Sequence, residues 1–216
     1  MKSRIFDVFI WIMTFVFIGS VFTMPDVIPI HWDSNWQVDG YGSRYSFIII
    51  SLIPILTYYG MLLSKRIDPN KKKFIAREKT FDIVRKALSL VFVALAGFFY
   101  YLTMNPTTDG SMGMGFIMGI MFVVIGNFMP KFPQNYFLGI KTPWTLANEE
   151  VWKKSHHFGG YAFVLCGVVN IVAAIIFPKA IIITLLLSVV IEAGVTLIYS
   201  YVIYKKIDKD IDDERI

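Results

Sequence analysis

Side chains able to do chemistry are concentrated in two polar segments and in the middle of two apolar runs. His31, Asp33 and Asp39 lie within the first polar segment. Imidazole and carboxylate are ordinary zinc ligands, but these three match no metal motif, such as two histidines one helical turn apart with an acid. We therefore expect no metal ion at this segment and no cofactor elsewhere.

Six long apolar runs must position these residues. The chain has 216 residues, of which 56% are hydrophobic and only 17% charged, and its mean hydropathy is +0.58. Each run has close to the ~20 residues that a helix needs to cross a bilayer. The expected spans are Ile5–Thr23, Tyr45–Leu63, Ala87–Thr103, Met112–Met129, Tyr161–Phe177 and Ile181–Tyr204. The sequence thus predicts an all-α, polytopic membrane protein with six transmembrane helices.

The cationic residues predict the orientation of these spans. Arg44 and Lys179 fall on one side, and the other Lys and Arg residues, from Lys2 to Arg215, fall on the opposite side. Positive charge accumulates in cytoplasmic loops, so we expect both termini in the cytoplasm of a bacterial cell, with the protein in its plasma membrane. The net charge of +5 is then explained by topology and by anionic lipid headgroups, and no direct binding of nucleic acid is expected.

Loops and spans together suggest three units. Residues 1–63 form a two-span unit with an outer loop at 24–44, residues 64–86 form a basic cytosolic loop, and residues 87–216 form a four-span unit whose inner loop is 125–157. The first span ends without a small-residue cleavage site, so we expect it to be retained.

The outer loop is predicted to be a compact turn structure, such as a small hairpin. Pro25 and Pro29 oppose helix, and Asp39-Gly40 is typical of a turn. Its acids and its tryptophans Trp32 and Trp36 would suit a cationic, apolar ligand, or would serve as interfacial residues only.

The inner loop is predicted to fold back on the bundle. It has three prolines, and its aromatic residues, such as Trp144 and Trp152, are too apolar to remain in water. Asn148 is a candidate helix cap and is followed by Glu149 and Glu150, which are favoured in a first helical turn. We therefore expect a short amphipathic helix before the fifth span. Gly115 and Gly119 in the fourth span predict close approach of a neighbouring helix.

Two polar residues lie within apolar runs. Glu192 is near the middle of the sixth span, where an ionisable group facing lipid costs about 2.5 kcal/mol or more. We expect it to face the bundle, with Asn170 of the fifth span as its partner. The pair is either interhelical glue or a functional, proton-sensitive site.

The loop sequences resemble a known family. The inner loop carries Ile125-Gly126-Asn127, Pro130-Lys131, Asn135-Tyr136-Phe137, Gly139-Ile140-Lys141-Thr142-Pro143-Trp144-Thr145-Leu146, Val151-Trp152 and Ser155-His156. These motifs resemble the signature of the immunity-protein family for the sporulation-delaying-protein toxin. The outer Pro25-Asp26 through His31-Trp32, followed by Val38 to Ser43, is similar to the N-terminal domain of unknown function often found in that family.

The resemblance implies a membrane protein that protects the cell against a secreted toxic peptide. It also implies a receptor role, in which a cytosolic winged-helix repressor is drawn to the membrane. Mapped by position, His31, Trp32, Asp33 and Asp39 would face the toxin. The cytosolic signature would comprise Asn127, Asn135, Lys141, Thr142, Pro143, Trp144, Trp152 and His156.

Two residues depart from the family pattern. Lys141 stands where Arg is common, which keeps the charge but loses a bidentate fork. Trp36 stands where a Gly is common in the outer loop, which bears on what that loop binds.

Two other classes of function remain as alternatives. A transporter or exporter of a peptide or ion would use Glu192 and Asn170, although the chain shows no internal repeat. An enzyme is not expected, because His31 lies outside while His156 and His157 lie inside, so that no His–acid or Ser–His group should assemble.

Overall fold

The computed structural model describes residues 2–213 of the chain. Six of the described helices are long and apolar enough to cross a membrane, which confirms the predicted all-α, polytopic fold. They are α1 (Lys2–Ser20), α2 (Phe47–Ile67), α3 (Glu78–Met104), α4 (Ser111–Phe128), α6 (Glu149–Ile176) and α7 (Ile181–Asp213). A one-turn helix, α5 (Pro143–Ala147), precedes α6. Arg215, one of the cations used for the predicted orientation, lies outside the described residues.

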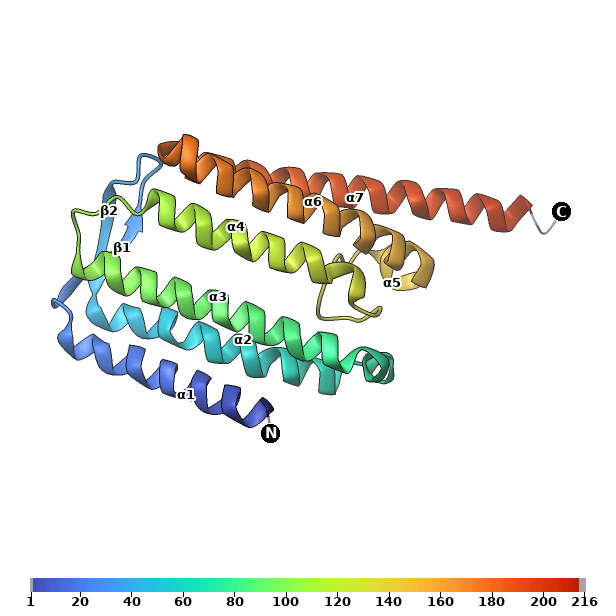
Figure 1. Ribbon diagram of the computed structural model, residues 1–216. Helices are drawn as coiled ribbons and strands as arrows, with labels where there is room; N and C mark the ends of the chain where they lie inside the picture. Colours follow the sequence, from blue (N-terminus) through green and yellow to red (C-terminus); the bar gives the residue numbers. More distant parts are fainter. Residues whose placement is uncertain (1, 214–216) are drawn as a thin grey trace.

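The two ends of the bundle differ (Figure 1). At one end lies an antiparallel hairpin of β1 (Val27–Trp32) and β2 (Val38–Ser43), so the predicted compact outer loop is confirmed. At the other end lie α5 and both ends of the described chain. We call these the outer end and the inner end. That the inner end faces the cytoplasm stays a prediction from the distribution of charge.

The helices pack as two groups of three. In the N-terminal group, α2 contacts both α1 and α3, and in the C-terminal group α6 contacts both α4 and α7. The contact of α3 with α4 joins the groups.

Small residues allow the close contact of α4 with α6. A Cβ atom added at Gly119 would lie 2.8 Å from the carbonyl oxygen of Gly167, and one added at Gly126 would lie 2.6 Å from that of Gly160. The predicted approach of a neighbouring helix to the fourth span is thereby confirmed, with α6 as the neighbour.

Two helices begin earlier than the hydrophobic runs predict. Helix α3 starts at Glu78 rather than near Ala87, because its first turns bury Phe81 and Val84 while Glu78 and Lys79 are exposed. Helix α6 starts at Glu149, so the expected short amphipathic helix is wrong as a separate element. It is the first part of one continuous helix, since no proline interrupts the segment from Asn148 to the fifth span.

Candidate functional site

The outer hairpin is held in shape by its own turn. Asp33 accepts hydrogen bonds at Oδ1 from the backbone N–H of Asn35 (2.9 Å) and of Gln37 (2.8 Å). Its carboxylate is therefore used locally, as is common for aspartate in turns. Of the residues predicted to face the toxin, Asp33 is thus a turn-forming residue in the structure.

Trp36 lies in the same turn with a backbone φ of 62°. This left-handed conformation favours glycine, which is the residue common at this place in the resembling family. The side chain turns inward, where it is buried and packs with Leu102, Ala174 and Ile181. Trp36 therefore packs the hairpin against the outer ends of α3, α6 and α7.

His31 and Asp39 face each other across the hairpin. His31 Nδ1 lies 2.5 Å from Asp39 Oδ1, and both side chains are exposed. The expectation that no His–acid pair assembles is therefore wrong, because the strand register brings together two residues eight positions apart. Gly40 permits this register, since a Cβ atom there would lie 2.8 Å from His31 Cβ.

An apolar pocket of about 510 Å³ lies beneath the hairpin. Trp32, Trp36 and His31 line it from the hairpin, and further lining comes from the helix ends, including Ile50, Phe99 and Met114. The Nε1 donor of Trp36 is buried and has no hydrogen-bond partner among the described residues. A largely apolar pocket with a few polar groups is typical of a ligand site.

The inner loop between α4 and α5 is organised by Asn135, which is fully buried. Its Nδ2 donates to the carbonyl oxygens of Pro133 (2.9 Å) and Leu138 (3.0 Å). Its Oδ1 accepts from the backbone N–H of Phe137 (3.0 Å) and of Leu138 (2.7 Å). One side chain thus satisfies the backbone of a tight loop that makes no helix or sheet.

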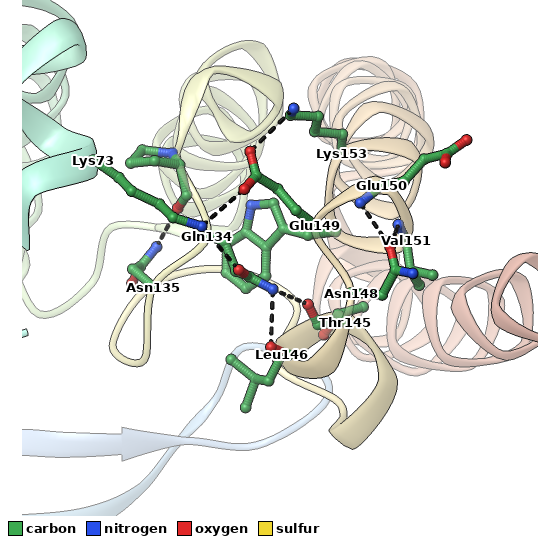
Figure 2. Close-up of polar contacts among 12 residues, drawn as sticks. Lys73, Gln134, Asn135, Thr145, Leu146, Asn148, Glu149, Glu150, Val151 and Lys153 are labelled. Atoms are coloured by element: carbon green, nitrogen blue, oxygen red, sulfur yellow. Dashed lines mark hydrogen bonds and ion pairs between the residues drawn. The ribbon is translucent and has the colours of Figure 1, made fainter. Parts of the chain in front are cut away.

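Gln134 joins this loop to α5 and to the basic loop at residues 64–86 (Figure 2). Its Nε2 donates to the carbonyl oxygens of Thr145 and Leu146, both at 2.9 Å, and its Oε1 accepts from Lys73 Nζ at 3.1 Å. Lys73 Nζ also lies 2.9 Å from Glu149 Oε2 in the first turn of α6. Lys73 therefore links the basic loop at residues 64–86 to the inner loop at residues 125–157.

Two caps start the inner helices. Thr142 and Thr145 form a capping box at α5, with Pro143 in its first turn, and Asn148 caps α6 by accepting from the N–H groups of Glu150 and Val151. Both arrangements satisfy free backbone donors. The predicted role of Asn148 as a helix cap is confirmed. Thr142, which the sequence places in the cytosolic signature, caps α5 in the structure.

His156 fixes the loop against α6. Its Nε2 accepts from the backbone N–H of Ile140 (3.0 Å), so its Nδ1 must carry the proton and donate to the carbonyl oxygen of Trp152 (2.9 Å). Gly139 has a φ of 106°, and a Cβ atom there would lie 2.1 Å from His156 Nε2. The imidazole ring is therefore used for positioning the loop.

The signature tryptophans are buried or pack on the bundle. Trp152 is buried, stacks on His156 and donates from Nε1 to the carbonyl oxygen of Phe132 (3.1 Å). Trp144 Nε1 donates to Ser200 Oγ on α7 at 2.8 Å. The prediction that the inner loop folds back on the bundle is confirmed.

Two signature residues stay at the surface. Lys141 is exposed and donates to the carbonyl oxygen of Phe137 (3.1 Å). Asn127 is exposed near the end of α4 and takes no part in the hydrogen bonds that shape the loop. The structure therefore gives Asn127 and Asn135 different roles, although both belong to the same signature.

Two residues that matter here were missed from the sequence. Asp68 is buried and accepts from the backbone N–H of Tyr136 (2.8 Å) and of Asn70 (2.6 Å). Arg85, which the sequence places in the basic cytosolic loop at 64–86, is buried, pairs with Asp82 and lies over the ring of Tyr58. The spacing of Asp82 and Arg85, three residues apart on one helix, was the available signal.

The two intramembrane polar residues are buried but do not pair as predicted. Asn170 Nδ2 donates to Ser188 Oγ (2.8 Å), one turn along α7 from Glu192. Neither carboxylate oxygen of Glu192 has a hydrogen-bond partner among the described residues. The predicted pairing of Asn170 with Glu192 is therefore wrong, because the residue of α7 that meets Asn170 is Ser188, one turn away.

Six apolar helices long enough to cross a bilayer place the chain in the class of multi-pass membrane proteins. The folded inner loop carries the motifs that resemble the signature of an immunity-protein family. Residues 131–200 match the SdpI/YfhL protein family, and residues 8–57 match a domain of unknown function, DUF1648. The chain is similar to Immunity protein SdpI of Bacillus subtilis (strain 168), with 26% identity over 211 residues that cover 96% of this chain and 99% of that protein. These matches confirm the predicted resemblance. No solved structure matches this chain.

Proposed function

We propose that this chain is a membrane immunity protein that protects its cell by binding a secreted toxic peptide at the outer end. The observation that carries the proposal is the apolar pocket of about 510 Å³ beneath the hairpin. Similarity along almost the whole chain to a protein named for immunity supports the role.

The charge at the outer end favours a cationic, apolar segment of the peptide. Residues 24–44 contain three aspartates and one arginine. On the adjoining loop, hydrogen bonds from Ser111 lower the pKa of Asp109 below its ordinary value, and Lys179 adds one positive charge near it. An apolar pocket beneath a hairpin that carries acidic residues suits an amphipathic cation through both kinds of contact.

A pocket-filling substitution tests the site. We expect Met114→Trp to abolish protection, because an indole in the pocket excludes the peptide, while Met112→Trp should preserve it. Met112 is exposed two residues earlier on the same helix and does not line the pocket. The measurement is the membrane potential of a toxin-sensitive host expressing each variant, after addition of the sporulation-delaying peptide.

Each result has a definite meaning when membrane levels of the variants are equal. Protection by both variants would contradict binding in this pocket and leave immunity intact. A collapse of the potential even with the unaltered chain would reject immunity to this peptide. Because Asp33 shapes the turn, His31→Ala is the better hairpin variant, and it should weaken protection without unfolding the hairpin.

We propose further that the inner loop passes the bound state to a cytosolic winged-helix repressor. Tyr136 and Phe137 are 50% and 40% exposed at the tip of a loop that Asn135 holds rigid, and Lys141 is exposed beside them. Exposed aromatic residues on a rigid support are typical of a protein contact.

Phe137→Ala should lose recruitment of a fluorescently tagged repressor to the membrane on toxin exposure, while protection is retained. Fluorescence microscopy of living cells gives this readout. Tyr161→Ala, at an exposed aromatic on the lipid-facing surface of α6, is the control. Recruitment that persists with Phe137→Ala would contradict this contact.

A further inference from the structure

A second cavity, of about 390 Å³, lies between the membrane-spanning helices and the inner loop. Helix α4 contributes Phe122 to its wall, α6 contributes Phe163, and the inner loop contributes Gly139 and Ile140. Its α7 wall includes Val189, which is exposed on the surface that faces lipid. A ligand can therefore reach the cavity from the lipid, separately from the outer pocket.

Glu192 supplies the only ionisable group among the described residues that line this cavity. Glu192 is only 3% exposed. Neither of its carboxylate oxygens has a hydrogen-bond partner within residues 2–213. A carboxylate buried in apolar surroundings is costly unless a cation or a hydrogen-bond donor meets it. The cavity thus has two acceptors in need of donors.

The surroundings favour an organic cation over a metal ion. Calcium and magnesium require several oxygen ligands. No group of three or more His, Cys, Asp or Glu that could hold a metal ion occurs in the described part of the chain. The hydroxyl of Thr196, which also lines the cavity, already donates to the backbone oxygen of Glu192. An ammonium group instead brings its own N–H donors, and apolar walls accommodate a hydrocarbon chain.

We propose that this cavity binds an amphiphilic primary amine, with its ammonium group on the Glu192 carboxylate and its hydrocarbon chain between α4 and α7. The bound cation holds the carboxylate in its ionised form. A primary ammonium satisfies both oxygens through its N–H groups, whereas a quaternary ammonium has no N–H group to donate. The site therefore selects for charge and for hydrogen-bond donors together.

Calorimetric titration of the purified protein in neutral detergent, with empty micelles subtracted, tests the proposal. Octylammonium should bind at least about tenfold more tightly than octanol or octyltrimethylammonium, since each lacks one of the two recognised features. Glu192→Gln should weaken the binding of octylammonium by at least about tenfold and leave the affinity for octanol unchanged. Glu150→Gln, at an exposed acid in the first turn of α6, should change neither affinity.

Equal affinity of the unaltered protein for octylammonium and octanol would overturn the proposal, and this comparison needs no variant to fold. Retention of tight binding in Glu192→Gln would overturn it as well. Equal affinity for octyltrimethylammonium would contradict recognition through N–H donors. Ala193→Phe, which narrows the cavity from α7, should weaken the binding of octylammonium. Leu186→Phe, at an exposed position that does not line the cavity, should leave that binding unchanged.

Discussion

Gly119→Ile should lower the stability of the folded bundle by about 3 kcal/mol, because overpacking a tight contact forces backbone or side-chain shifts. Even the first carbon of the new side chain would lie 2.8 Å from the carbonyl oxygen of Gly167 and 2.6 Å from a side-chain carbon of Ile171. The backbone of α6 cannot yield as the end of a flexible side chain can. We expect a clear fall in the apparent melting temperature in detergent and in the amount of monodisperse protein.

Gly60→Ile is the matched control for this substitution. Gly60 also lies in a membrane-spanning helix, but nothing is within 4 Å of a Cβ atom added there. Its melting temperature should stay close to that of the unaltered chain. Equal losses from both substitutions would mean that the effect comes from isoleucine in a span and not from the α4–α6 contact.

Asn135→Ala should disrupt the inner loop and cost about 3 kcal/mol, because buried backbone groups left without partners cost about 1–3 kcal/mol each. The substitution removes the partner of two carbonyl oxygens and two N–H groups at once. We expect loss of the ordered loop, which limited proteolysis at the inner end would detect as new cleavage between α4 and α5.

Asn127→Ala provides the comparison within the same signature. Asn127 is exposed near the end of α4, and its substitution should leave both the proteolysis pattern and the melting temperature nearly unchanged. A large effect at Asn127 with a small one at Asn135 would contradict the arrangement of the inner loop described above.

The positions of the glycines explain why part of the packing was predictable. The spacing of Gly115 and Gly119 indicated a close helix contact, because small residues one turn apart leave a groove. The partner helix was not predictable, since Gly160 and Gly167 become neighbours of α4 only when the chain is folded. A similar limit applies to His31 and Asp39, whose pairing depends on the register of the hairpin.

The sequence by itself determined the class of the protein, the number of spans, the hairpin and the fold-back of the inner loop. These features depend on local composition, such as apolar runs, turn residues and aromatics that cannot remain in water. Only the tertiary structure decided that Asn135 shapes the loop while Asn127 does not. It also decided that the carboxylate of Glu192 faces a cavity and does not contact Asn170. The physical reason is that burial and hydrogen-bond partners depend on contacts between distant segments, and a shift of one helical turn changes which side chains meet.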